Sequence, residues 1–403
     1  MHCTRKITND LIWVGVNDRQ VSLFENLYPV SNGMAYNSYI LLDEKTVLFD
    51  TVSKDVSHRF MENVSYALGE KKLDYLVVHH MEPDHAAGIN EILKAYPDVK
   101  IVCNEKTRTF SEQFFDVDEN VNYHIVKEND TLCTGRHTLR FIMAPMVHWP
   151  EVMVTYDETH KILFSADAFG SFGASNGIVF TDEIDFESEY TSEMRRYYAN
   201  IVGKYGTQVQ ALLKKAFNLE IEMICPLHGL LWRSHIDKLF SIYNSWSSYT
   251  PESVGVMIVY GSIYGGTENA AEILACKLRE RGIKTTLIDA SSTHVSHIVS
   301  AAFQWSHIVF ASITYNAGLF LPIGVLVDEL ISRNFQNRTI AIIENGTWAS
   351  ACGDLIRTKL EKAKNINILE SSVCIKSSVK EENLNQIETM ADEIAASVSK
   401  YKK

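Results

Sequence analysis

Residues 79–85 read HHMEPDH and directly follow the apolar run LDYLVV at 73–78. The apolar run predicts a buried strand, so the polar cluster leaves the end of that strand through a loop. Four residues of the cluster are candidate metal ligands: His80, Glu82, Asp84 and His85. Burying four such side chains without a metal or mutual pairing is costly. The alternative is that they form a polar loop exposed to solvent. The density of ligand types favours a metal site, and we interpret His79 as a structural neighbour.

Three further candidates also follow runs that predict buried strands, in FIMAPMVH, KILFSAD and EMICPLH: His148, Asp167 and His228. Each is a weak signal alone, because a lone histidine is more often structural. Together the seven side chains provide four imidazoles and three carboxylates, enough for two metals if one carboxylate bridges. Imidazole with carboxylate and no thiolate suits iron, manganese or catalytic zinc. Such a site could activate water or bind a small oxidant.

The composition is that of an acidic globular protein with room for two domains. The chain has 403 residues, 46% of them hydrophobic, and a formal net charge of −12. This charge argues against nucleic acid or an anionic membrane as the main partner. The N-terminus does not resemble a signal peptide and no long apolar run is present, so a cytoplasmic protein is expected. None of the seven cysteines forms a C-x-x-C pair, which argues against a built-in rubredoxin-like or iron–sulfur module.

A change of pattern predicts the domain boundary. In the first part of the chain, strands alternate with helices and hairpin-like pairs, which indicates helices layered on sheets. SSYTPES at 247–253 has the composition of a linker, and repeated strand–helix units follow it. These repeats predict a doubly wound parallel sheet that binds ligands at the carboxyl ends of its strands. We expect one domain at 1–249 and a second at 252–403.

Three loops in the second domain predict a flavin site. VYGSIYGGTENAAEI at 259–273 reads as a strand, a loop rich in glycine and hydroxyl residues, and a helix, which suits a phosphate monoester. It lacks G-x-G-x-x-G, so a dinucleotide is the weaker hypothesis. SITYNAGL at 312–319 and ENGTWAS at 344–350 follow the next relevant strands. In a flavodoxin-like sheet these turns flank the switch point, which favours FMN.

The seven spaced ligands resemble the pattern of the flavodiiron proteins, H-x-E-x-D-H followed by His, Asp and His. Zinc hydrolases of the same metallo-β-lactamase fold have histidine in the place of Glu82. The resemblance implies an N-terminal metallo-β-lactamase-like αββα sandwich followed by a flavodoxin-like domain. It further implies that one iron is held by His80, Glu82 and His148, that the other is held by Asp84, His85 and His228, and that Asp167 bridges them.

The second half resembles the flavodoxin domain of the same family. The resemblance implies FMN contacts from three sets of residues: Ser262, Ile263, Tyr264, Gly265, Gly266 and Thr267; Thr314, Tyr315, Asn316, Ala317 and Gly318; and Asn345, Gly346, Thr347 and Trp348. Two departures are visible. Gly266 stands where the family often has a second hydroxyl residue, and Glu25 stands where several members have a histidine beside the diiron pocket. Tyr197 is a further candidate for the pocket.

The resemblance implies an enzyme that reduces oxygen to water with four electrons from two ferrous ions and reduced FMN, and that could also reduce nitric oxide to nitrous oxide. It further implies a head-to-tail homodimer or a dimer of dimers, and a separate electron donor such as rubredoxin or a reductase fed by a nicotinamide. Three alternatives stay open: nitric oxide reduction as the main activity, a zinc hydrolase fused to a flavodoxin-like module, and an electron carrier or redox sensor that is not an enzyme.

Overall fold

The computed structural model describes residues 2–115 and 121–401. The chain divides into two compact units, Met1–Tyr198 with Thr207–Ser241, and Ala199–Gly206 with Ile242–Lys403. The short segment 199–206 and the end of the helix before the linker therefore group with the second unit. Domain limits at 1–249 and 252–403 stay a prediction from the sequence.

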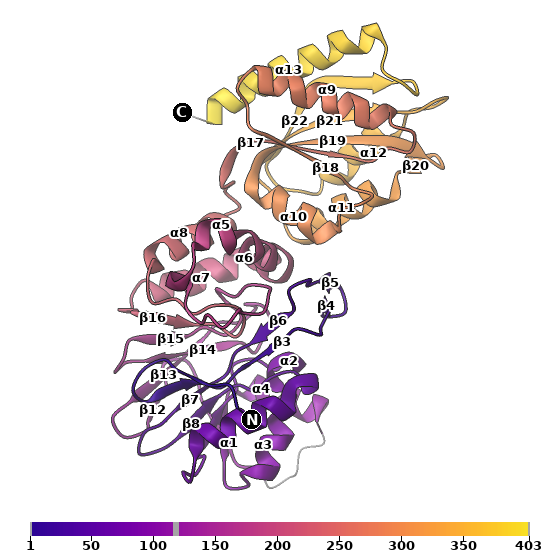
Figure 1. The fold of residues 1–403 in the computed structure, drawn as a ribbon. Coiled ribbons are helices and arrows are strands. Elements are labelled where there is room, and N and C mark those ends of the chain that lie inside the picture. Colours follow the sequence, from indigo (N-terminus) through magenta and orange to yellow (C-terminus); the bar gives the residue numbers. More distant parts are fainter. Residues whose placement is uncertain (1, 116–120, 402–403) are drawn as a thin grey trace. The chain divides into compact units, whose positions relative to one another are not determined.

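The first unit is built on two sheets packed face to face (Figure 1). One sheet has the order β1-β2-β7-β8-β9-β10-β11, with bounds Arg5–Lys6, Leu11–Trp13, Tyr39–Leu41, Val47–Phe49, Tyr75–Val77, Lys100–Cys103 and Tyr123–Ile125. The other has the order β12-β13-β14-β15-β16, with bounds Thr131–Cys133, Thr138–Met143, Met153–Asp157, Ile162–Phe164 and Met223–Cys225. Two small pairs join β3 to β6 and β4 to β5, with bounds Val16–Asp18, Met34–Tyr36, Leu23–Phe24 and Tyr28–Pro29. The stacked rings of Phe49 and Phe164, with centroids 3.9 Å apart, join the two main sheets in one core.

Helices cover the outer faces of the two sheets (Figure 1). Beside the first sheet lie α1 to α4, with bounds Ser57–Leu68, Pro83–Ala86, Ile89–Ala95 and Glu105–Phe114. Beside the second lie α5 to α8, with bounds Phe186–Glu189, Thr191–Tyr197, Gly206–Ala216 and Ile236–Ser247. Short 3₁₀ turns span Lys54–Val56, Thr181–Glu183 and Gly203–Tyr205, and a π turn spans Tyr198–Val202. This arrangement confirms the predicted metallo-β-lactamase-like αββα sandwich.

The second unit is a doubly wound parallel sheet. Its order is β18-β17-β19-β21-β22, with bounds Thr285–Asp289, Ser253–Tyr260, Trp305–Tyr315, Arg338–Asn345 and Ile366–Ile375, and β20 (Gly318–Leu319) pairs with β19. Its helices α9 to α13 have bounds Gly266–Glu280, Val295–Gln304, Leu321–Ser332, Cys352–Leu360 and Glu381–Tyr401. Helices α9 and α13 cover one face of the sheet, and α10 to α12 cover the other (Figure 1). This confirms the predicted flavodoxin-like fold and puts its switch point between β17 and β19.

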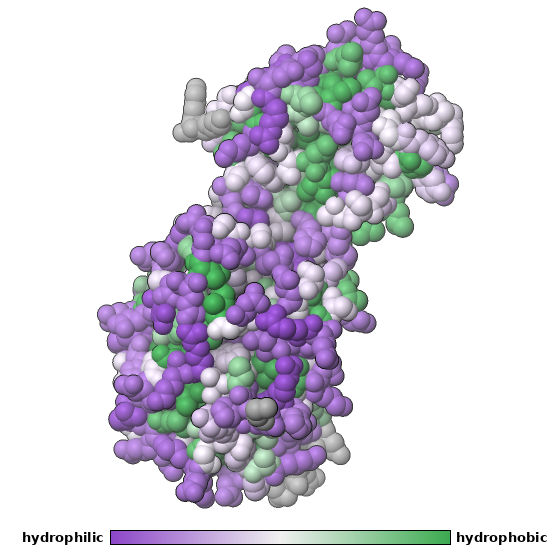
Figure 2. Space-filling view, in the orientation of Figure 1, coloured by the Kyte–Doolittle hydropathy of each residue, from purple (hydrophilic) through white to green (hydrophobic). Residues whose placement is uncertain are grey.

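The surface is that of a polar protein. On the face drawn in Figure 2, hydrophilic residues cover most of the area and hydrophobic residues form small patches. Among the described residues, every helix is too short or too polar to cross a membrane.

The acid stability of the second unit should depend on His307 in β19. Its Nε2 lies 3.0 Å from the Ser397 hydroxyl in α13, and its side chain is buried. Burial lowers the pKa of His307 to about 4, whereas an unfolded histidine titrates near pH 6.5. The folded state binds the proton more weakly, so this stabilisation is complete above pH 6.5 and is lost as the pH falls towards 4. Between pH 7 and 4.5 the wild type should lose roughly 2 kcal/mol more stability than His307→Asn.

Urea denaturation at both pH values, followed by pulse hydrogen exchange on β19 and α13 peptides, measures this difference for the second unit alone. The exposed residue His124 in the first unit provides the control substitution, His124→Asn. An equal loss of stability in wild type and His307→Asn would contradict the assignment.

Candidate diiron and flavin sites

Strand ends of the first unit deliver the predicted metal ligands to one place. His80 follows β9, His148 follows β13, Asp167 follows β15 and His228 follows β16. Because β15 and β16 are parallel neighbours, the loops after them begin at the same edge of the second sheet. The other ligands, Glu82, Asp84 and His85, sit in the turn that begins the short helix α2. Glu82 is the residue before the helix, and Pro83 fills the first helical position, where no amide hydrogen is needed.

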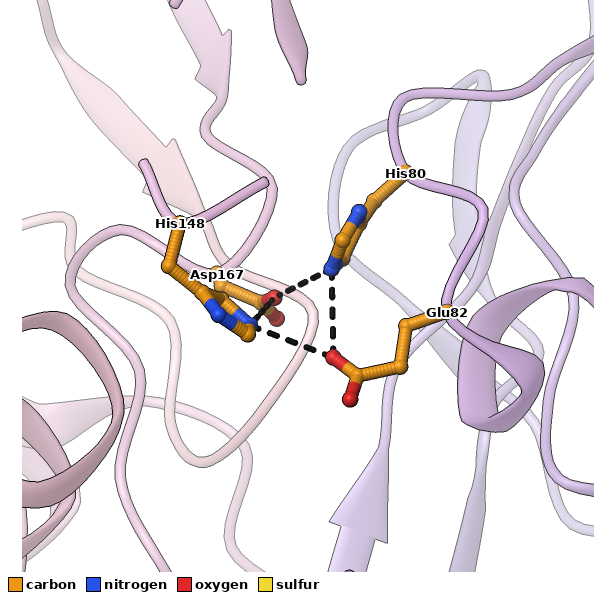
Figure 3. Close-up of side chains that lie close together, drawn as sticks. All are labelled: His80, Glu82, His148 and Asp167. Carbon is orange, nitrogen blue, oxygen red and sulfur yellow. Dashed lines mark hydrogen bonds and ion pairs between the residues drawn. The ribbon is translucent and has the colours of Figure 1, made fainter. Parts of the chain in front are cut away.

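The first group of ligands is His80, Glu82, His148 and Asp167. Their side chains point toward one another (Figure 3). Glu82 Oε2 lies 3.2 Å from His80 Nε2 and 3.1 Å from His148 Nε2. Asp167 Oδ2 lies 3.2 Å from His80 Nε2 and 3.3 Å from His148 Nε2. Two imidazole nitrogens and two carboxylate oxygens therefore surround one point.

The second group is Asp84, His85 and His228. Asp84 Oδ2 lies 3.3 Å from His85 Nε2 and 3.1 Å from His228 Nε2. The remaining oxygen of Asp167, Oδ1, lies 3.2 Å from His85 Nε2 and 3.7 Å from His228 Nε2. Asp167 thus presents one oxygen to each group, which is the geometry that a bridging carboxylate requires. This is the division of ligands that the resemblance implies, and their binding of iron stays a prediction.

Unsatisfied polar atoms test whether the groups fit a metal centre. Both oxygens of Asp84 and of Asp167 are buried and accept no hydrogen bond from the described residues. Burial alone would raise the pKa of Asp167, but the imidazoles of His85 and His148 hold that pKa well below its usual range. An ionised carboxylate that is buried without hydrogen bonds is stable only beside compensating positive charge. The residues present therefore fit two divalent cations with a shared carboxylate.

Residues behind the ligands fix the imidazole rings. Glu151, fully buried, accepts a hydrogen bond from His80 Nδ1 at 2.7 Å and another from the Met81 amide at 3.0 Å. The carbonyl oxygen of Ala35 lies 2.8 Å from His228 Nδ1. Such partners set the ring orientation and raise the basicity of a metal-bound histidine. Glu151 was not among the residues predicted from the sequence, where its signal is an acidic residue three positions after His148 in HWPE.

His79 belongs to neither ligand group among the described residues. Its Nδ1 lies 2.5 Å from Asp50 Oδ2 and its Nε2 lies 2.7 Å from the Thr155 hydroxyl. Since Asp50 follows a strand of the first sheet and Thr155 lies in the second sheet, the ring joins the two sheets. This supports the interpretation of His79 as a structural residue.

Aromatic side chains wall the metal groups. The ring of Phe24 lies 5.3 Å from that of His228, and the ring of Tyr197 lies 5.5 Å from it. Trp149 lies 5.1 Å from the ring of His80. Tyr197 therefore lies beside His228, and its role at the pocket stays a prediction. These rings restrict the access of water to the ligand atoms.

Glu25 lies next to the first ligand group. Although the residue is exposed in the single chain, its carboxyl group is partly desolvated against Glu82, and this burial together with the charge of Glu82 raises the pKa of Glu25 to about 8. The raised pKa favours the protonated form of Glu25.

The three predicted flavin loops leave β17, β19 and β21, which are neighbouring parallel strands. In the first loop, Gly265 adopts a φ of +85°, and its amide donates to the Ser262 hydroxyl at 3.1 Å. Helix α9 begins at the next residue, Gly266. The positive φ favours glycine and turns the chain so that the helix N-terminus faces the loop, as phosphate binding requires.

The other two loops are braced by their own polar side chains. Asn316 and Ala317 have φ values of +50° and +57° and form the two-residue turn between β19 and β20. The Thr314 hydroxyl accepts the amides of Ala351 and Cys352 at 2.9 and 3.1 Å, so it caps α12. Asn345 Nδ2 donates to the Thr267 hydroxyl at 3.2 Å, which ties the third loop to the first.

The aromatic residues of these loops are exposed. Tyr264 and Trp348 are 95% and 92% exposed, and Tyr315 is half exposed. Large exposed rings on three neighbouring loops are a place where a planar ring system can stack. The remaining predicted contacts lie in the same three loops: Ile263, Gly318, Gly346 and Thr347.

Each unit matches a known protein family. Residues 34–229 match the family described as ODP family beta lactamase, and residues 258–360 match the flavodoxin family. Over 321 residues the chain is 32% identical to an uncharacterized protein of Methanocaldococcus jannaschii, which covers 79% of each chain. Over 363 residues it is 30% identical to an anaerobic nitric oxide reductase flavorubredoxin of Klebsiella pneumoniae, covering 89% of this chain and 74% of that one.

Two solved structures match nearly the whole chain. The rubredoxin oxygen:oxidoreductase of Desulfovibrio gigas aligns with a TM-score of 0.92 and 27% identity, over 98% of this chain and 99% of that one. The flavodiiron protein of Giardia intestinalis aligns with a TM-score of 0.91 and 25% identity, over 99% of this chain and 98% of that one. Both units, their order and their lengths are thus shared with these proteins. The chain belongs to the flavodiiron protein family, whose members are oxidoreductases that carry FMN and a diiron centre.

Proposed function

We propose that the chain reduces one oxygen molecule, with four electrons and four protons, to two water molecules. The observation that carries this proposal is the pair of ligand groups joined by Asp167, with the carboxylate of Glu82 in the first group. A carboxylate at that position, in place of a third imidazole, gives a harder ligand set that suits iron. The proposal is also supported by the similarity of this chain, over nearly its whole length, to the rubredoxin oxygen:oxidoreductase of Desulfovibrio gigas.

The proposed ligands of one iron are His80, Glu82 and His148, those of the other are Asp84, His85 and His228, and Asp167 bridges the two. When bound, the two irons and FMN supply the four electrons. Glu151 holds the ring of His80 in place, and the aromatic wall keeps bulk water away from the ligand atoms. The zinc hydrolase hypothesis loses support, because the family of this chain carries iron and flavin.

The proposed flavin ligands are the three loops after β17, β19 and β21, within a domain at 252–403, and the proposed metal domain spans 1–249. Ser262 and the start of α9 would hold the phosphate, and the exposed rings of Tyr264 and Trp348 would lie beside the isoalloxazine. These exposed rings also favour a homodimer in which a second copy covers them. Electrons would come from a separate donor in the cytoplasm, such as a rubredoxin or a reductase fed by a nicotinamide.

Nitric oxide reduction is the second candidate, in which two nitric oxide molecules, two electrons and two protons give nitrous oxide and water. The observation that favours it is the similarity, at 30% identity, to the anaerobic nitric oxide reductase flavorubredoxins. Glu25 is the residue to compare between the two reactions, because its carboxyl group can bind or release a proton next to Glu82.

Parallel turnover measurements test the proposal. The chain with measured iron and FMN content is reduced anaerobically and then mixed with oxygen or with nitric oxide. We expect oxygen uptake to consume four electrons per molecule without release of hydrogen peroxide. Faster turnover of nitric oxide, with nitrous oxide as product, would make the second candidate the main activity. Consumption of neither gas by protein replete in iron and FMN would contradict both and favour an electron carrier.

A further inference from the structure

A second cluster of metal-ligand side chains lies in the first unit, away from the diiron ligands. It consists of Asp10, His137 and His160, whose ligand atoms lie within 4.8 Å of one another. His137 Nε2 lies 3.0 Å from Asp10 Oδ2, and His160 Nδ1 lies 3.6 Å from Asp10 Oδ1. Four-coordinate zinc keeps its ligand atoms roughly 3.4 Å apart, given bonds of about 2.0–2.1 Å. The distances of 3.0 Å from His137 to Asp10 and 3.6 Å from His160 to Asp10 lie on either side of that value.

The cluster is separate from the diiron ligands. Strands β13 and β14 run antiparallel between them. His137 precedes β13 and His148 follows it, while Glu151 precedes β14 and Asp157 ends it. The length of β13 therefore separates the two places, about 20 Å at 3.3 Å per residue. Metal binding at one place does not use a ligand of the other.

His137 has a carboxylate hydrogen-bond partner on Nδ1, as metal-bound histidines commonly do. His137 Nδ1 donates to Asp157 Oδ2 at 2.8 Å, and both side chains are buried. The same arrangement joins His80 to Glu151 at 2.7 Å in the diiron site. A carboxylate on Nδ1 fixes the tautomer that leaves Nε2 as the ligand and increases its basicity. Once its Nε2 is deprotonated, His137 therefore offers that atom as a ligand on the side of Asp10.

The second imidazole has an unused ligand atom. The Nδ1 atom of His160 is buried and has no hydrogen-bond partner among the described residues, although it faces Asp10. The rings of His137 and His160 meet edge to face, with centroids 4.5 Å apart. A buried ring nitrogen without a partner carries a desolvation cost that a cation between the three ligands would remove.

The charges of the cluster match a divalent cation. Asp10, Asp43 and Asp157 are three carboxylates, and Arg136 pairs with two of them at 3.1 Å, so one guanidinium faces three acidic side chains beside the two imidazoles. Arg136 is largely exposed and pairs with Asp43 as well as with Asp10. The alternative is a protonated His137 that bridges Asp10 and Asp157 as a purely structural ion pair.

The cluster opens to a cleft of about 1290 Å³ in the first unit. Asp10 and His160 line this cleft. A metal held by these three protein ligands would keep a coordination position for water on the side of the cleft, as catalytic zinc sites do. We propose that Asp10, His137 and His160 bind one zinc ion in addition to the two irons of the diiron centre.

Zinc stoichiometry on the iron-loaded full-length chain tests this. The protein with two irons and FMN is titrated with Zn²⁺ against a competing chelator, and iron and zinc are counted on the same sample. We expect one zinc per wild-type chain with the iron unchanged. His160→Ala should weaken zinc binding at least about 100-fold, and Asp157→Asn about 10–100-fold. His160 is partly exposed in a turn, so its replacement spares the core.

The matched control is His124→Ala, which removes an exposed histidine of β11 and should bind zinc as the wild type does. X-ray absorption at the zinc edge should show imidazole ligands that His160→Ala loses. Equal zinc binding in wild type and His160→Ala would overturn the proposal. So would zinc that binds only as iron leaves, because that zinc would occupy the diiron ligands.

Discussion

Asp167→Ala should reduce oxygen or nitric oxide turnover by roughly 100-fold or more and lower the iron content below two per chain. Asp167 is buried and is the side chain that presents an oxygen to each ligand group, at 3.2 Å from His80 and 3.2 Å from His85. Without it, two divalent cations would lie close together with no carboxylate between them to offset their repulsion. The flavin absorption spectrum should stay unchanged, because Asp167 belongs to the first unit and the flavin loops belong to the second.

Two variants show whether the loss comes from the bridge. Asp167→Asn keeps the size of the side chain but removes the charge and one metal-binding oxygen. Its turnover should therefore fall nearly as much as that of Asp167→Ala. Asp182→Ala removes a carboxylate of the same unit that pairs with Arg233 at the surface, and it should retain iron and turnover. Iron content by plasma emission spectrometry and gas uptake are measured on each. Normal turnover with two irons in Asp167→Ala would show that another residue bridges the metals.

The sequence predicted much of the metal site because each ligand follows an apolar run that ends at the same side of the sandwich. A strand of buried residues fixes where its last side chains emerge, so His80, His148, Asp167 and His228 could be grouped before their distances were known. The flavin loops were predictable for the same reason, since they follow neighbouring parallel strands. In both sites, local pattern and strand order together determine the geometry.

The residues that support the ligands could not be predicted, because their partners depend on strand register. Glu151 reaches His80 across 71 positions of the chain, and Asp10 reaches His137 across 127. Nothing in the local pattern around Asp10 distinguishes it from a turn residue. The local pattern also does not predict the π turn and the 3₁₀ turn that lie between α6 and α7, from Tyr198 to Tyr205. There Gly206 packs so closely on the Ser247 carbonyl that a Cβ would lie 2.4 Å from it.

Gly266→Ser should weaken FMN binding by roughly 10–100-fold, although it restores the hydroxyl residue that the family often has at this place. A Cβ at Gly266 would lie 2.0 Å from the backbone oxygen of Ser377 and 3.2 Å from Asn345 Nδ2. The Ser377 backbone cannot move away easily, because its amide and its carbonyl both bond the side chain of Asn345, at 3.0 and 3.1 Å. The added atoms would therefore displace the start of α9 or the loop after β22, which contains Ser377.

The dissociation constant of FMN, measured by quenching of flavin fluorescence on the flavin-free protein, checks this expectation. Gly324→Ser is the matched control, since its Cβ would meet Leu319 at 3.6 Å, an ordinary contact in the same unit. The control should bind FMN within a few-fold of the wild type. FMN binding by Gly266→Ser as tight as that of the wild type, or tighter, would contradict this expectation. It would mean that the Ser377 carbonyl moves away and that the wild type lacks a phosphate contact which the serine hydroxyl makes. Weaker FMN binding by Gly266→Ser instead means that this chain has glycine at the start of α9 because the Ser377 carbonyl leaves no space for a side chain there.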